Sequence, residues 1–133
     1  GGILIGRENC GNSNLIIEFI TEPMTADQRS RNRFLRKDKR HLDFFKKLYE
    51  ENEGVYGYMG EWHTHPENIP QYSFIDSNNW KKIGKEMKGG IQYHIIAGIQ
   101  EVGIWEYNAV QKRITKICSI DWKGILKENE TII

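Results

Sequence analysis

Two histidines, a serine and an aspartate in one short stretch constrain this chain more than any other feature. The sequence reads HTHP from His63 and SFID from Ser73 to Asp76; seven residues separate His65 from Ser73, and two separate Ser73 from Asp76. In an extended strand, residues i and i+2 point to the same side, so both imidazoles can face one point. A carboxylate from the next element would complete three ligands and leave a fourth position open, which is the pattern of catalytic zinc sites.

Each half of this pattern also has a purely structural interpretation. A lone His-x-His pair is common as a surface or structural feature. Ser73 and Asp76 are spaced as a capping box, in which a serine and an acid three residues later meet the free amides at the start of a helix. The two roles are compatible, because an aspartate in the first helical turn can still turn its carboxylate toward a metal. Together, at this spacing, the two halves are far more specific than either one alone.

The combined pattern resembles the motif of the JAB1/MPN/MOV34 metalloenzyme (JAMM) family. That motif is an upstream glutamate, His-Ser/Thr-His, seven residues, a serine, two residues and an aspartate. The resemblance extends from Gly1 to about Tyr107 and looks most like the bacterial JAB-type peptidases, some of which are encoded beside cGAS-like nucleotidyltransferases in anti-phage operons. It implies a single JAB/MPN domain over residues 1–133, with an α/β/α sandwich similar to cytidine deaminases.

The general-base glutamate of the family has no counterpart within this chain. By resemblance it would fall just before Gly1, and the family's first helix would also lie upstream. We therefore expect either an N-terminally truncated chain or an incomplete active site. Two nearby acids are poor substitutes: Glu8 lies at the far end of the first strand, and Glu61 is more naturally a solvated or salt-bridged strand residue.

The residues and the resemblance together predict a hydrolytic mechanism. A metal held by His63, His65 and Asp76 would acidify a bound water and polarise a carbonyl. Ser73 would place its hydroxyl beside the developing oxyanion and would not act as a nucleophile. The resemblance implies zinc as the metal and, as substrate, the C-terminal tail of a ubiquitin-like protein joined to a lysine or another amine. Candidate substrate contacts are Met24, Arg31, Arg33 and Tyr72.

Two other functions remain open. One is a catalytically silent JAB/MPN interaction module, although such relatives usually lose the metal ligands that this chain keeps. The other is a different zinc hydrolase or deaminase on the related sandwich. The deaminase alternative expects His-x-Glu and Pro-Cys-x-x-Cys, and neither pattern occurs in the sequence.

Composition limits the partners. The formal net charge is +1, so electrostatics favour neither nucleic acid nor an anionic membrane. No apolar run approaches the ~20 residues that span a bilayer. Cys10 and Cys118 form neither a disulfide framework nor a Cys-x-x-Cys site, and we expect free thiols in a reducing cytoplasm.

Strand and helix patterns alternate along the chain and predict a mixed sheet covered by helices. Apolar strand patterns cover 2–5, 15–20, 56–64, 91–99, 103–108 and 113–121, and helical patterns cover 39–52 and 74–88. The first two strands are expected to form a hairpin through a turn at residues 9–12, and 123–133 to be a short helix or a loose tail. Leu42, Phe45, Leu48 and Tyr49 recur at helical spacing and predict one buried face, with His41 in a structural role. Residues 21–38 are polar and basic, and are either a solvated loop or the insertion that borders the substrate groove in JAMM peptidases.

Overall fold

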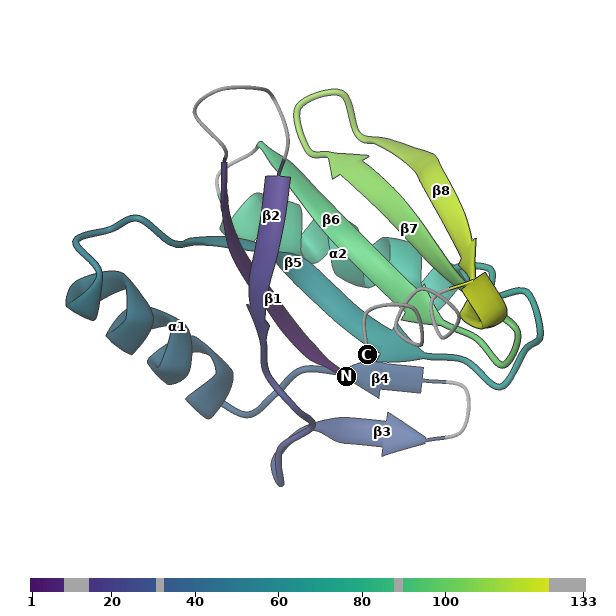
Figure 1. Cartoon of the computed structure of the whole chain (residues 1–133), viewed down its shortest axis with the longest axis horizontal. Helices are drawn as coiled ribbons and strands as arrows, with labels where there is room; N and C mark the ends of the chain where they lie inside the picture. Colours follow the sequence, from purple (N-terminus) through teal and green to yellow (C-terminus); the bar gives the residue numbers. More distant parts are fainter. Residues whose placement is uncertain (9–14, 31–32, 88–89, 125–133) are drawn as a thin grey trace.

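A mixed six-stranded sheet forms the centre of the computed structural model, which describes residues 1–8, 15–30, 33–87 and 90–124 (Figure 1). The strand order is β2-β1-β5-β6-β7-β8. These strands are β1 (Gly2–Glu8), β2 (Leu15–Ile20), β5 (Gly57–Thr64), β6 (Ile91–Ala97), β7 (Glu101–Asn108) and β8 (Arg113–Asp121). Within this sheet β5 and β6 are parallel, and the other neighbouring strands are antiparallel. Parallel neighbours need a crossover connection, and α2 (Phe74–Glu86) lies in it.

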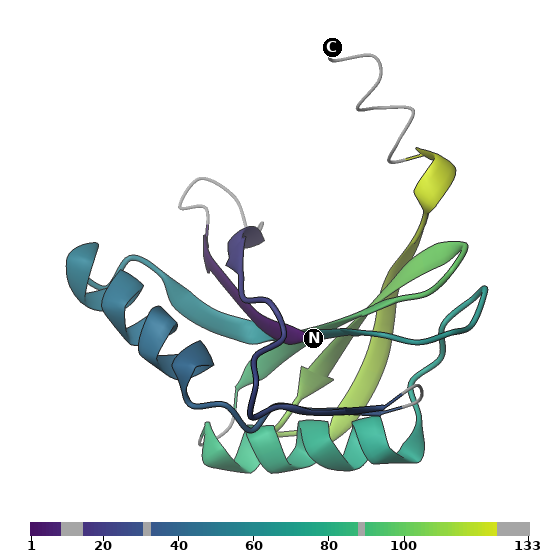
Figure 2. The ribbon, with the colours of Figure 1, turned by 90° about the horizontal axis from the view of Figure 1, so that it is seen from below.

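Helix α2 covers one face of the sheet, as Figure 2 shows. Trp80 of the helix forms a buried cluster with Ile96 of β6 and with Trp105 and Tyr107 of β7. The helix approaches the sheet closely at Gly84, where a β-carbon would lie 2.8 Å from the Tyr107 ring. The core therefore lies between α2 and the middle of the sheet and holds α2 against β6 and β7.

The middle of strand β1 is almost completely buried. Ile3, Leu4 and Ile5 of β1 are at most 1% exposed, and such an uninterrupted apolar run is typical of a strand covered on both faces. Strand β5 contains a bulge opposite β1: Leu4 pairs with Gly60 and Ile5 pairs with Tyr58, so one residue of β5 is left over. Gly60 has a φ of 146°, and a β-carbon there would lie 1.6 Å from the Tyr93 carbonyl oxygen.

The segment 21–38 is not a solvated loop, and that alternative is wrong. It contains an antiparallel pair, β3 (Gln28–Ser30) and β4 (Arg33–Leu35), which forms a separate two-stranded sheet. Its buried residues are Thr21, Asp27, Phe34 and Asp38. The two acids turn inward because they accept hydrogen bonds from backbone N–H groups that would otherwise lack partners.

Helix α1 (Arg40–Glu51) matches the predicted helix to within one residue at each end, but the predicted buried face is only partly buried. Leu42 is 43% exposed and Tyr49 is 50% exposed. The helix lies beside β1 and β5 (Figure 1), with the Phe45 ring 6.4 Å from that of Tyr58. No described element covers the side of α1 that faces away from the sheet. The helix is therefore less buried than the spacing of its apolar residues predicts. His41 is fully buried at the first turn and has a structural role, as predicted.

The predicted mixed sheet flanked by helices is confirmed, and the predicted strands agree with the observed ones to within a few residues. Trp105 is a core residue, and the Trp122 indole donates to the Gly98 carbonyl. Cys118 is a free, exposed thiol. The expected turn at 9–12 with Cys10, and the tail beyond 124, lie outside the described residues. Across the described ranges, no helix has the length and apolar character needed to cross a membrane.

Candidate metal centre

Strand β5 presents His63 and His65 on one side. Both histidines are buried, whereas Thr64 between them is exposed, which is the alternation of an extended strand. His63 pairs with Ile96 of β6, and the His65 N–H donates to the Ala97 carbonyl at 3.0 Å. The backbone of both residues is thus held by the neighbouring parallel strand, and their rings have a defined direction.

Helix α2 presents Asp76 through its first turn. The Ser73 Oγ accepts from the Asp76 N–H at 3.1 Å, and the Asp76 Oδ2 accepts from the Ser73 N–H at 2.8 Å. This is the capping box that the sequence predicts, and it satisfies two amides that the helix leaves free. The cap also fixes the Asp76 side chain, whose carboxylate points toward the histidines.

The three side chains converge on one point. His63 Nε2 lies 3.1 Å from Asp76 Oδ1, His65 Nε2 lies 3.2 Å from Asp76 Oδ2, and the two Nε2 atoms are 3.1 Å apart. Ligands at ~2.0–2.1 Å from a tetrahedral zinc are separated by roughly 3.3–3.4 Å. Two imidazoles and one carboxylate at these separations fit a small divalent cation, and all three residues are buried.

Glu67 supports the orientation of His65. Its Oε1 lies 2.9 Å from His65 Nδ1. A carboxylate at this distance accepts a hydrogen from Nδ1 and leaves the lone pair on Nε2, on the side of Asp76. The site residues expected from the sequence do not include Glu67. Its position two residues after His65 is the signal that could have identified this role.

The charge on Asp76 suits a metal ligand. Burial alone would raise the pKa of its carboxyl, but hydrogen bonds from His63 and the Ser73 backbone, together with the nearby imidazoles, lower the pKa below its usual value. The carboxylate form therefore predominates at neutral pH, and this is the form that binds a cation.

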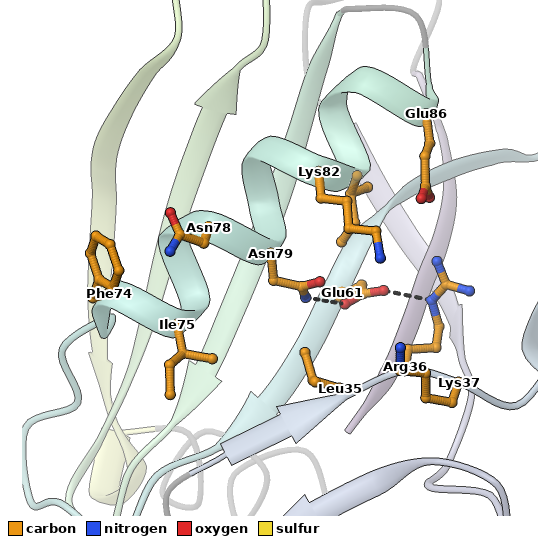
Figure 3. Close-up of a pocket in the computed structure, with 11 residues that line it drawn as sticks. Leu35, Arg36, Lys37, Glu61, Phe74, Ile75, Asn78, Asn79, Lys82 and Glu86 are labelled. Carbon is orange, nitrogen blue, oxygen red and sulfur yellow. Dashed lines mark hydrogen bonds and ion pairs between the residues drawn. The ribbon is translucent and has the colours of Figure 1, made fainter.

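The β3–β4 hairpin forms a wall of the site. The Phe34 ring stacks on His63, with ring centroids 6.5 Å apart and an angle of 16° between the planes. The next residues, Leu35 and Arg36, line a hollow of about 520 Å³ between β4 and α2 (Figure 3). Phe74 and Ile75, which precede Asp76 in the first turn of α2, line the same hollow, so it runs along α2 from the turn that carries this ligand; the three ligands themselves are not among its lining residues.

Glu61 is engaged in this hollow. Its Oε2 lies 2.5 Å from Arg36 Nε, and its Oε1 accepts weakly from the Asn79 amide at 3.5 Å (Figure 3). Glu61 is 3% exposed, so the salt-bridged interpretation is confirmed and the solvated one is wrong. Arg36 and Asn79 engage both oxygens of the carboxylate, which agrees with the view that Glu61 is a poor substitute for the general base of the family.

The structure describes the surroundings of two of the four expected substrate contacts, Met24 and Tyr72. Met24 is half-buried at the start of the segment that holds β3 and β4. The Tyr72 ring packs 5.4 Å from Trp80 and 6.1 Å from Trp105, which anchors the loop before α2. Arg31 lies outside the described residues, and only the backbone of Arg33, in β4, is described. Ser73 adjoins a ligand through its cap on Asp76.

Comparison with known proteins agrees with this arrangement. Residues 1–110 match the family described as prokaryotic homologs of the JAB domain. The chain is 41% identical over 80 residues to a protein of Escherichia coli (strain TW11681) named CD-NTase/cGAS isopeptidase, a match that covers 60% of this chain and 50% of the relative.

Two further proteins carry the same name. The Vibrio cholerae protein is 36% identical over 81 residues, covering 61% of this chain and 51% of the relative. The Pseudomonas aeruginosa protein is 31% identical over 88 residues, covering 66% of this chain and 54% of the relative. The chain thus spans about half the length of the curated relatives it matches. With the match over residues 1–110 and the buried His63, His65 and Asp76 group in place, the chain belongs to the family of prokaryotic JAB homologs.

Proposed function

We propose that this chain is a zinc-dependent isopeptidase of the JAMM type, with His63, His65 and Asp76 as the metal ligands. The observation that carries the proposal is the convergence of three buried side chains: the two imidazole Nε2 atoms are 3.1 Å apart, and each lies 3.1–3.2 Å from one oxygen of the Asp76 carboxylate. Two neutral imidazoles and one carboxylate with an open fourth position are characteristic of catalytic zinc sites. The name shared by the three relatives supports isopeptide hydrolysis.

The side chains at the site suit amide hydrolysis. A zinc ion held there would supply an activated water and a Lewis acid for the scissile carbonyl. The Ser73 oxygen accepts from the Asp76 N–H as a helix cap, so its own hydrogen can be donated to the carbonyl oxygen of the substrate. The Phe34 ring packs on His63, and the three ligand residues are buried. Ser73 therefore stabilises negative charge and is not the nucleophile.

A glutamate preceding Gly1 is our proposal for the group that carries the proton from water to the leaving amine. Strand β1 is antiparallel to β5, and Gly2 pairs with Trp62. In a longer chain, residues before Gly1 that continued this pairing would run beside His63 and His65. The geometry of β1 thus supports a base at that position, while Glu61 remains paired with Arg36.

The proposed substrate is an extended C-terminal tail, of a ubiquitin-like protein, joined through its terminal carbonyl to an amine. The hollow between β4 and α2 has apolar walls at Leu35, Phe74 and Ile75 (Figure 3). Strand β4 is paired on one side by β3 within its two-stranded sheet, and an extended peptide gains most by pairing with a strand edge. A narrow approach to the metal would favour Gly-Gly-like ends, which have no β-carbon.

The names of the relatives add a CD-NTase or cGAS protein to the candidate conjugates. We accordingly propose a place in bacterial anti-phage signalling and a cytoplasmic site of action, for which the free thiol of Cys118 is suited.

The test is metal content and turnover measured on the same zinc-loaded protein, extended to include the residues before Gly1. The expected result is one zinc per chain and cleavage of an isopeptide-linked conjugate, with both lost in His65→Ala. One zinc per chain with no cleavage of ubiquitin-like or CD-NTase conjugates would support a silent module instead. Absence of zinc after repletion would overturn the metal site itself.

A further inference from the structure

A buried chain of hydrogen bonds joins β1, the segment before β3 and α1, and the catalytic scheme above does not use it. The Ile3 N–H donates to Thr21 Oγ1 at 2.8 Å. Thr21 Oγ1 lies 2.5 Å from His41 Nδ1, and His41 Nε2 lies 2.6 Å from Asp27 Oδ2. The side chains of His41 and Asp27 are 0% exposed and Thr21 is 4% exposed. Burying this number of polar atoms does not destabilise the fold only if each polar hydrogen has an acceptor.

Asp27 determines the direction of these hydrogen bonds. Burial alone would raise the pKa of its carboxyl, but hydrogen bonds from the Asp38 backbone, from His41 and from two further backbone N–H groups lower the pKa to about 2. An ionised carboxylate only accepts, so His41 Nε2 carries a hydrogen. The Thr21 hydroxyl already accepts from Ile3 and has His41 Nδ1 as the acceptor for its own hydrogen. Every hydrogen is satisfied when His41 is the neutral Nε2–H tautomer.

The same carboxylate closes the base of the β3–β4 hairpin. Its Oδ1 accepts from the N–H groups of Lys37 and Asp38, both at 2.9 Å. Its Oδ2 accepts from the Met24 N–H at 2.9 Å, beside His41. Met24 precedes β3, and Lys37 and Asp38 follow β4, so one side chain holds both ends of the hairpin. His41 attaches this clamp to α1, and Thr21 attaches it to β1.

The clamp is connected to the metal centre by the hairpin and by β5. The hairpin carries Phe34, whose ring stacks on His63, and then Leu35, which lines the hollow along α2. The Thr21 carbonyl accepts from the Trp62 indole at 2.9 Å, one residue before His63. A change at Thr21 or His41 therefore alters how far β4 stands from α2, although neither side chain contacts the metal group.

We propose that His41 is a positioning residue: as the neutral Nε2–H tautomer between Thr21 and Asp27, it sets the β3–β4 hairpin at the working distance from α2 and so determines the affinity for the extended tail. This inference rests on the function proposed above. His41 touches neither substrate nor metal, so its removal acts on binding of the tail and leaves the chemical step and the metal ligands in place.

The experiment compares Thr21→Val with Thr21→Ser in the zinc-loaded protein, extended to include the residues before Gly1 as in the turnover test above. Valine keeps the shape of threonine but removes the hydroxyl, and serine keeps the hydroxyl. Thr21→Val should raise KM for a ubiquitin-like conjugate about tenfold, the equivalent of one buried hydrogen bond. The kcat and the zinc content should stay at the wild-type level, and Thr21→Ser should restore KM. His41→Gln retains a donor toward Asp27 and should likewise raise KM while kcat and zinc content stay at the wild-type level. This variant replaces Thr21→Val in the experiment if Thr21→Val does not fold.

Two measurements do not depend on turnover. Nitrogen NMR of the wild-type His41 ring should show the Nε2–H tautomer at pH 7, and hydrogen exchange at the Lys37 and Asp38 amides should be faster in Thr21→Val than in Thr21→Ser. An Nδ1–H tautomer or an imidazolium would overturn the proposal, as would unchanged KM and exchange, or loss of zinc together with tail affinity. If wild-type protein cleaves no conjugate, the proposed function fails, and the NMR and exchange results decide the positioning role alone.

Discussion

Replacing Arg36 with methionine should destabilise the protein by about 3–4 kcal/mol at pH 7, because it leaves the Glu61 carboxylate buried without its cation. The Arg36 and Glu61 side chains are 15% and 3% exposed, with Nε and Oε2 2.5 Å apart. Removing one partner of a buried ion pair typically costs roughly 3–5 kcal/mol. Protonation limits the loss, since neutralising an ordinary glutamate carboxyl at pH 7 costs roughly 3.7 kcal/mol. Methionine preserves much of the apolar stem, so the charge is the main change.

The assay is urea unfolding followed by tryptophan fluorescence between pH 5 and pH 8. The difference in unfolding free energy between wild type and Arg36→Met should shrink by about 1.4 kcal/mol for each pH unit below 7, because the unpaired Glu61 carboxyl takes up a proton more easily at lower pH. Adding Glu61→Gln should recover most of the loss, since no buried charge remains. A deficit under ~1 kcal/mol at pH 7 would mean that the pair behaves as an exposed surface bridge, and the reasoning would be refuted.

Three further predictions concern the clamp and the metal centre. The pKa of Asp27 falls from 3.8 to about 2 on folding. A carboxyl whose pKa is lowered by folding stabilises the protein above its unfolded pKa, and this stabilisation is lost as the pH falls through the folded pKa. Asp27→Asn should therefore be less stable than wild type at pH 7, and in acid unfolding its free energy of unfolding should fall by about 2 kcal/mol less than that of wild type between pH 5 and pH 1. Glu67→Ala should weaken zinc binding about tenfold in a chelator competition, because His65 loses the acceptor that orients its ring, and unchanged affinity would contradict that role. Ser73→Ala should lower unfolding free energy by about 1 kcal/mol and kcat by roughly 10²–10³-fold while zinc content stays constant, and Ser73→Thr is the matched control.

The metal group could be predicted from the sequence because its geometry is local. The alternation of His63 and His65 follows from strand structure, and the cap at Ser73 directs Asp76, so the three side chains need only one correct strand–helix contact. The positions of most strands and of α2 follow in the same way from short-range periodicity and from the large apolar side chains of the core.

The β3–β4 hairpin could not be predicted because its stability comes from distant partners. Asp27 and His41 are 14 residues apart, and Thr21 and His41 are 20 residues apart. In the sequence these residues are ordinary polar members of a basic stretch. Their burial depends on backbone N–H groups that converge only after folding. The partial exposure of α1 is the converse case: the spacing of Leu42 and Tyr49 indicates a buried face, but the neighbouring elements cover only part of it.

The extra residue of the β5 bulge, next to Gly60, determines which way the metal ligands point. Side chains of a strand alternate strictly, so inserting or deleting one residue between Gly57 and His63 would turn both histidines to the opposite face of the sheet unless the bulge absorbed the change. Only glycine fits the bulge, because of its φ of 146° and its contact with the Tyr93 carbonyl. The number of residues in this part of β5 therefore determines the face of the sheet on which the ligands lie. Active relatives should have no insertion or deletion of one residue in this part of the strand, whereas the loop between His65 and Ser73 can change length by one residue without turning a ligand to the other face.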